Sequence, residues 1–254
     1  MIRLSPSILV CSLAALASCT ESGSTPLFEH PVPAPFTLTG QDPAPDETDV
    51  PVDQPIAFTF SDVPDPDSLS RLSFALTSGS LLFTGGFRVD LIERRVRYVP
   101  ARDLPPHLLM RVHVGAGITS LDGRPLAAPA DWSFTTGTTD GGAPPPVPEL
   151  HADDVAPLFV TRCAGSCHAG PGATLGVNLE TAQAAYDTLV GRSARERPPL
   201  YRVAAGDSSR SYLLRKLLGA QTMVGDTMPP PPAEPLTAAE LRQIADWIDG
   251  GARR

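Results

Sequence analysis

Two cysteines followed directly by a histidine occur in the stretch Cys163-Ala164-Gly165-Ser166-Cys167-His168. This arrangement is typical of covalent haem attachment, because two thiols can add across the vinyl groups of haem while the imidazole binds the iron. The usual spacer between the cysteines has two residues; here it has three, and its small Ala-Gly-Ser run can bulge without disturbing either sulfur. The stretch therefore predicts one haem c, held by Cys163 and Cys167, with His168 as an axial ligand of the iron.

A close pair of cysteines also has other interpretations. A structural zinc site needs four ligands, and no second pair of cysteines or histidines lies near this one in the sequence. A disulfide between Cys163 and Cys167 stays open as an alternative, because an exported protein meets an oxidising compartment that allows a small loop to be closed in this way. A disulfide gives no reason, however, for a histidine directly after the second cysteine.

Met228 is the predicted sixth ligand of the iron. Its thioether is a soft, neutral ligand that raises the reduction potential of haem, and the four prolines that follow it form a stiff, extended backbone. Met223 is the reserve candidate, but no rigid element follows it. The alternative for Met228 is a methionine that fills a gap in the core.

The first 18 residues have the pattern of a bacterial secretion signal. They carry one basic residue, Arg3, and an apolar run at residues 8–16 that is too short to span a bilayer. The run ends in Leu16-Ala17-Ser18-Cys19, which resembles the processing signal of bacterial lipoproteins. That resemblance implies that Cys19 carries a lipid and holds the protein to a membrane, with ordinary secretion as the alternative. Thr20 is not the aspartate associated with inner-membrane retention, which favours the outer membrane, facing the periplasm or the cell surface.

The composition limits the classes of protein that the chain can represent. Its 254 residues, 42% of them hydrophobic, allow two modest domains. Residues 20–148 carry 16 acidic and 8 basic residues, against 12 and 11 in residues 149–254, and the net charge is −8. An acidic surface argues against nucleic-acid binding, which needs a basic face.

The segment at residues 33–137 has the pattern of a β-sandwich. Residues 19–32 are rich in small and polar residues, which suits a flexible tether. Short runs of alternating apolar and polar residues follow at 56–60, 87–91, 109–114 and 132–136. Their spacing between Pro, Asp and Gly turns predicts an antiparallel sandwich. We assign this domain a spacer or docking role, because its lone histidines and its irregular acidic run do not match a catalytic or calcium site.

This segment also resembles a known family. In DETDVPVDQPIAFTFSDVPDP near its start and DWSFTTG at its end, it is similar to the bacterial immunoglobulin-like domains of surface-layer and cell-envelope proteins, of the SbsA type. The resemblance implies an immunoglobulin-like fold and is silent about chemistry.

A linker at residues 138–148, flexible at Gly-Gly and stiff at its prolines, separates this segment from a helical one at residues 149–254. The apolar periodicity predicts a first helix that delivers Cys163 at its end, and a second over residues 181–190. Ser208 or Ser209 is expected to cap a third helix that stops at Gly219. Thr237 and Glu240 form a capping box for the last helix, which carries the apolar stripe Leu241, Ile244, Ala245 and Ile248.

The helical segment resembles the c-type cytochrome domains of bacterial lipoproteins. The resemblance rests on CAGSCH, GDSSRSYLLRKLLG and MPPPPAEPLTAAELRQIADWIDGGA. It implies a small helical fold with His168 and Met228 as the axial ligands. It also implies that the last helix crosses the first, with Trp247 or Ile248 near Phe159.

Three further residues are assigned to the surroundings of the haem. The backbone carbonyl of Pro171 is expected to accept a hydrogen bond from the imidazole and so to fix its orientation. Arg215 and Tyr201 are expected to donate to the haem propionates, with an arginine paired on an exposed helix face as the alternative.

The sequence therefore predicts a multidomain chain, with an all-β immunoglobulin-like sandwich followed by an all-α cytochrome c-like haem domain. Such a chain would be a membrane-anchored, one-electron carrier whose partners are redox proteins of the cell envelope, because two protein ligands leave no open position on the iron. One alternative is a haem-free binding or adhesion lipoprotein closed by a disulfide. Another is the electron-relay subunit of an oxidoreductase or peroxidase.

Overall fold

The computed structural model describes residues 33–142, 146–165 and 167–254. The predicted signal peptide at residues 1–18, the predicted lipidation site Cys19 and the predicted tether to residue 32 lie outside the described residues. So do residues 143–145 of the linker and Ser166 of the cysteine spacer.

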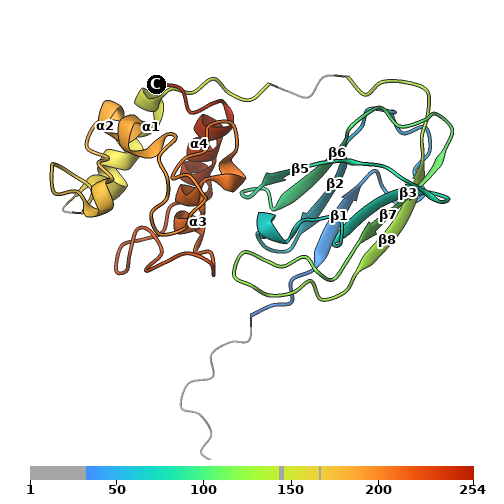
Figure 1. Ribbon diagram of the computed structural model, residues 1–254, viewed down its shortest axis with the longest axis horizontal. Helices are drawn as coiled ribbons and strands as arrows, with labels where there is room; N and C mark the ends of the chain where they lie inside the picture. Colours follow the sequence, from blue (N-terminus) through green and yellow to red (C-terminus); the bar gives the residue numbers. More distant parts are fainter. Residues whose placement is uncertain (1–32, 143–145, 166) are drawn as a thin grey trace, which may run out of the picture. The chain divides into compact units, whose positions relative to one another are not determined.

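Within the described residues, eight β-strands form two four-stranded antiparallel sheets, which face each other as a sandwich (Figure 1). One sheet has the order β1 (Leu38–Asp42), β2 (Ile56–Phe60), β6 (Arg95–Pro100), β5 (Gly85–Asp90). The other has the order β4 (Leu81–Leu82), β3 (Phe74–Ser78), β7 (Leu109–Val114), β8 (Ala130–Thr135). The predicted sandwich is confirmed, and its four predicted strands correspond to β2, β5, β7 and β8.

Alternation of side chains between the two faces of each strand builds the core of the sandwich. In β7, Met110, Val112 and Val114 are buried while the residues between them are exposed. Phe58 of β2 stacks on Phe74 of β3 across the two sheets, with ring centroids 5.6 Å apart. Burial of this apolar area is the main stabilising contribution in such a fold.

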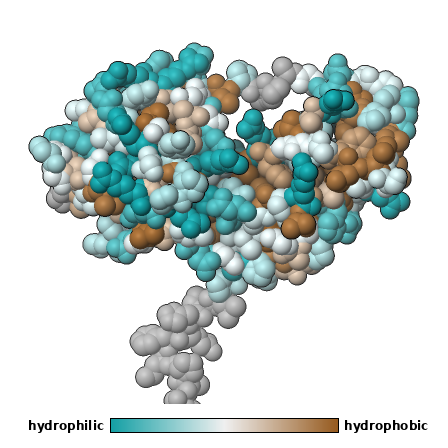
Figure 2. All heavy atoms as spheres, in the orientation of Figure 1, coloured by the Kyte–Doolittle hydropathy of each residue, from teal (hydrophilic) through white to brown (hydrophobic). Residues whose placement is uncertain are grey.

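Some apolar side chains stay at the surface of the sandwich. Figure 2 shows apolar residues mixed with polar ones on the face that it views. Leu72, Leu81 and Leu82 are exposed because they lie in a turn and in the two-residue edge strand β4, where few neighbours can cover them.

The C-terminal part of the chain is helical, as predicted. Its four α-helices in the described residues are α1 (Ala152–Phe159), α2 (Ala182–Leu189), α3 (Tyr212–Leu218) and α4 (Ala238–Asp249). A π-helical turn, η2 (Val160–Ala164), continues α1. The short 3₁₀ turns are η1 (Pro66–Ser68) in the sandwich and η3 (Thr174–Gly176) and η4 (Ser208–Arg210) in the helical part.

The predicted capping box of α4 is confirmed. Glu240 accepts a hydrogen bond from the backbone N–H of Thr237 at 2.6 Å, and the Thr237 hydroxyl accepts from that of Glu240 at 3.3 Å. These bonds satisfy two backbone groups that the helix itself leaves without partners. The helix ends at Gly250, as predicted.

The start of α3 differs from the prediction. Ser208 and Ser209 belong to the separate turn η4, whose cap is the carboxylate of Asp207, and α3 begins only at Tyr212. An aspartate accepts the backbone hydrogen bond at such a position as well as a serine does. The predicted end of the helix at Gly219 is confirmed, with that glycine in the left-handed conformation at φ 70°.

A second core holds the helices together. Trp247 of α4 is fully buried, and its ring packs edge-on against Phe159 of α1 with centroids 6.1 Å apart. The predicted neighbourhood of these two residues is confirmed. This packing fixes the end of α1, from which the cysteine stretch continues.

Candidate functional site

A cavity of about 680 Å³ lies in the helical part of the chain. Its walls come from η2, the cysteine stretch, η3, α2, α3 and the segment from Met228 to Pro232. Leucines supply much of its apolar surface, namely Leu175, Leu179, Leu189, Leu213 and Leu217. The volume is in the range of cavities that hold cofactors and small ligands.

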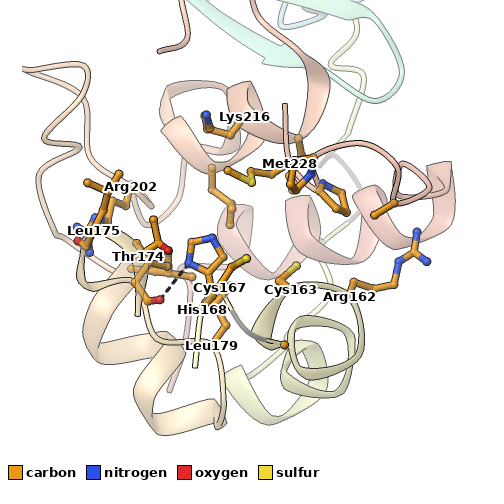
Figure 3. A pocket seen from close by; sticks show the side chains of 18 of the residues that line it. Arg162, Cys163, Cys167, His168, Thr174, Leu175, Leu179, Arg202, Lys216 and Met228 are labelled. Atoms are coloured by element: carbon orange, nitrogen blue, oxygen red, sulfur yellow. Dashed lines mark hydrogen bonds between the residues drawn. The ribbon is translucent and has the colours of Figure 1, made fainter. Parts of the chain in front are cut away.

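Cys163, Cys167 and His168 all line this cavity (Figure 3). Cys163 lies in the π-helical turn η2, which holds more residues than an α-helical turn because its hydrogen bonds reach one residue further back. The turn ends at Gly165, whose φ of +33° suits a residue without a Cβ. Both cysteines lie on the cavity wall, although three residues separate them in the sequence.

Burial sets the chemistry of Cys163. The low-polarity surroundings raise the pKa of its thiol to about 11, and the nearby Arg162 only partly offsets this effect. The thiol therefore stays protonated at neutral pH. Cys163 forms no disulfide within the described residues.

This raised pKa makes the apoprotein sensitive to alkali. Between pH 9 and pH 11 the Cys163 thiol ionises in the unfolded chain but not in the folded one, so the free energy of unfolding falls as pH rises. We expect a loss of about 2–3 kcal/mol over this range from Cys163 alone. Urea denaturation at pH 8.5 and pH 11 measures it. The loss should be smaller by this amount in Cys163→Ala, and an equal loss in both proteins would contradict the assignment.

Within the described residues, the imidazole of His168 makes one hydrogen bond. Its Nδ1 atom lies 3.1 Å from the backbone carbonyl oxygen of Val177, drawn as the dashed line in Figure 3. A carbonyl can only accept, so Nδ1 carries a proton, and in the neutral imidazole Nε2 then keeps its lone pair. The structure gives this role to Val177, and not to Pro171 as predicted, because the backbone turns back towards the histidine only after η3.

Met228 lies on another wall of the same cavity, together with Pro229, Pro230 and Pro231. Its backbone N–H donates to the carbonyl of Lys216 at 2.9 Å, which ties the methionine to α3. The Lys216 ammonium donates in turn to the carbonyls of Val224 and Asp226, at 2.8 and 2.5 Å. The reserve candidate Met223 is not among the residues that line the cavity.

The structure places Arg215 and Tyr201 away from the cavity. Arg215 is fully buried, and its Nη1 donates to Asp67 at 2.8 Å, with Asp65 at 3.7 Å. Tyr201 is about half exposed and does not line the cavity either. Both predictions are therefore wrong: the cavity-lining residues of α3 include Leu213, Lys216 and Leu217 but not Arg215, and Tyr201 lies before α3 in an irregular segment.

The basic residues that do line the cavity are Arg162, Arg195, Arg202 and Lys216. Sequence reasoning missed Arg195 and Arg202, because they lie in the irregular segment between α2 and α3, where no periodicity shows which way a side chain points. A cluster of arginines in an acidic chain is the one signal that marks this segment.

Two other kinds of feature are absent from the described residues. No group of three or more His, Cys, Asp or Glu side chains is arranged there to hold a metal ion. Among the described helices, none combines the length and apolar character that a membrane span requires.

Comparison with known proteins assigns a family to the sandwich. Residues 32–136 are a bacterial Ig-like domain, and the family match ends before the helical part. No curated protein is significantly similar to the chain.

Part of the chain is similar to proteins of known structure. L,D-transpeptidase 1 of Mycobacterium tuberculosis is 26% identical, with a TM-score of 0.29 over 41% of this chain and 40% of that one. The L,D-transpeptidase of Mycobacterium smegmatis is 21% identical, with a TM-score of 0.31 over 41% of each chain. The surface-layer protein SbsC, domains 1–6, is 11% identical, with a TM-score of 0.33 over 41% of this chain and 14% of that one. The chain thus spans about two fifths of the length of these transpeptidases. It spans a smaller share, 14%, of the surface-layer protein.

Proposed function

We propose that residues 149–254 bind one haem c covalently and carry single electrons in the cell envelope. One observation carries the proposal: Cys163, Cys167, His168 and Met228 line a single cavity, although Met228 is distant from the others in the sequence. Two thiols, an imidazole and a thioether are the donor set of a c-type cytochrome.

The residues present fit such a group. Cys163 and Cys167 would hold it through thioether bonds, and His168 and Met228 would bind its iron. The cavity is mostly apolar, and the Nε2 lone pair of His168 is kept available by the hydrogen bond at Nδ1. Haem would supply one-electron redox chemistry, and two protein ligands would leave no open position for a substrate.

The remainder of the chain has a supporting role in this proposal. A lipid on Cys19 would hold the protein to a membrane, with the outer membrane preferred, and redox proteins of the envelope would be its partners. The bacterial Ig-like domain would act as a spacer or docking module between the membrane and the haem.

Two sets of cysteine variants test the proposal in the full chain, expressed in a host with cytochrome c maturation. Cys163→Ala with Cys167→Ala should abolish covalent haem on a denaturing gel while the protein stays in the membrane fraction. Cys19→Ala should release the protein and leave the haem stain unchanged. A colourless wild-type protein that still reaches the membrane would contradict the haem proposal alone.

The runner-up is a haem-free envelope binding or adhesion lipoprotein, which the bacterial Ig-like domain favours. In that case Cys163 and Cys167 would form a disulfide in the oxidising envelope. An electron-relay subunit of an oxidoreductase or peroxidase comes third. It would be favoured if Met228 did not bind the iron and the iron reacted with peroxide.

A further inference from the structure

The turn η3 at the cavity edge has a strained backbone. Leu175 has a φ of +54°, in the left-handed region that a side chain with a Cβ disfavours, and Gly176 follows at +67°. The Leu175 side chain is half exposed and lines the cavity. Strain of this kind persists only where surrounding contacts hold the backbone in place.

Arg202 supplies those contacts. Its Nη2 donates to the carbonyl of Leu175 at 2.7 Å, and its Nη1 donates to those of Gly176 at 3.2 Å and Thr188 at 2.8 Å. One planar guanidinium therefore ties the strained Leu175 and the adjacent Gly176 to the end of α2. Burial and the nearby charges of Arg195 and Arg192 lower the pKa of Arg202, so the three carbonyls also compensate an unfavourable setting for a cation.

The turn that Arg202 holds leads directly to the partner of His168. The residue after Gly176 is Val177, whose carbonyl accepts from Nδ1 of the imidazole. At the start of the turn, the N–H of Thr174 donates to the carbonyl of Cys167 at 2.8 Å. A displacement of the turn would thus move His168 through two contacts, one with the carbonyl of Val177 and one through the neighbouring Cys167. Figure 3 shows Arg202, Leu175 and Thr174 together on the side of the cavity where the dashed line reaches His168.

We propose that Arg202 is a positioning residue, which fixes the η3 turn and through Val177 sets the orientation and donor strength of the His168 imidazole. The proposal rests on the function proposed above only where it concerns haem. Partners of this kind around an axial histidine commonly change affinity or activity by 10–100-fold when they are removed.

Arg202→Lys is the informative variant, because lysine keeps the charge but has no planar fork that can bridge two adjacent carbonyls. Arg195→Gln is its matched control. Arg195 lines the same cavity and carries the same charge, and no hydrogen bond of its guanidinium is found among the described residues. Arg202→Gln serves if the lysine variant does not fold, which far-UV circular dichroism reports.

The first measurement uses the full-length apoprotein, without haem. Nitrogen-15 NMR of the histidine rings should show His168 with its proton on Nδ1 in the wild type and in Arg195→Gln. In Arg202→Lys that proton should exchange faster with water and its signal should move toward that of an exposed histidine. Unchanged His168 signals in a folded Arg202→Lys or Arg202→Gln protein would overturn the proposal.

The second measurement uses the haem-loaded chain. A weaker bond at Nδ1 makes the imidazole a poorer donor to ferric iron, so Arg202→Lys should raise the reduction potential. We expect about a tenfold change in the ratio of reduced to oxidised protein, which is about 59 mV for one electron. Arg195→Gln removes a positive charge and should lower the potential instead. An unchanged potential in Arg202→Lys would overturn the positioning role, whereas failure of the wild type to bind haem would overturn only the proposed function.

Discussion

Met228→His is expected to lower the reduction potential of the haem-loaded chain by about 0.1 V or more, because axial ligands alone set haem potentials over a span of about 0.8 V. A thioether favours ferrous iron, and an imidazole favours it less. The backbone N–H of Met228 bonds to Lys216 in α3, so the new side chain starts from the same place on the cavity wall. Potentiometric titration of both proteins measures the change.

Met223→His is the matched control, since Met223 lies in the same loop but does not line the cavity. Its potential should equal that of the wild type. Met228→Leu should leave the iron with an open position that binds carbon monoxide. If Met223→His changed the reduction potential and Met228→His did not, the assignment of Met228 as the sixth ligand would be wrong.

Trp247→Ala is expected to lower the free energy of unfolding of the helical part by about 3–5 kcal/mol. Trp247 is fully buried, packs edge-on against Phe159, and donates from Nε1 to the carbonyl of Arg253 at 2.9 Å. Its removal leaves a cavity between α4 and α1 and takes away one of the two hydrogen bonds that the carbonyl of Arg253 accepts, the other coming from the backbone N–H of Ala152. Urea denaturation of the full chain, followed by circular dichroism at the helical minimum, measures the loss.

Trp247→Phe separates the two contributions, because it keeps most of the apolar area and removes only the hydrogen bond. A loss of about 1 kcal/mol is expected for it. A loss below 1 kcal/mol in Trp247→Ala would show that the contact between α4 and α1 does not stabilise the helical part.

The regular elements could be predicted because their patterns follow from burial on one face. Met110, Val112 and Val114 alternate with exposed residues in β7, and Ile244 and Ile248 recur at helical spacing in α4. Strands β1, β3, β4 and β6 were not predicted. In β6, Arg95 and Arg97 alternate with the buried Val96 and Tyr98, so the sequence pattern for this strand was present.

The candidate site could be predicted only where a residue type implies its own chemistry. Cys163, Cys167, His168 and Met228 are of this kind, and all four line the cavity. The type of a residue does not indicate which partner its backbone carbonyl will have. The carbonyl of Val177 reaches His168 only because Leu175 and Gly176 both adopt positive φ, which a leucine gives no reason to expect.

The arginines show that the position of a side chain is also hard to predict from sequence. Arg215 lies on a predicted helix, yet its fully buried side chain lies outside the cavity lining and forms an ion pair with the half-exposed Asp67. Arg202 lies in an irregular segment whose path is fixed by contacts with distant residues. Such positions follow from tertiary packing and not from local pattern.

The mass of one tryptic peptide tests the central claim most directly. Arg162 precedes Cys163 and the next basic residue is Arg192, so trypsin releases residues 163–192 with both cysteines and His168. From the full chain matured in a cytochrome c-competent host, we predict that this peptide carries one haem bound to both cysteines. A peptide of unmodified mass, or one lighter by the two hydrogens of a Cys163–Cys167 disulfide, would contradict the account.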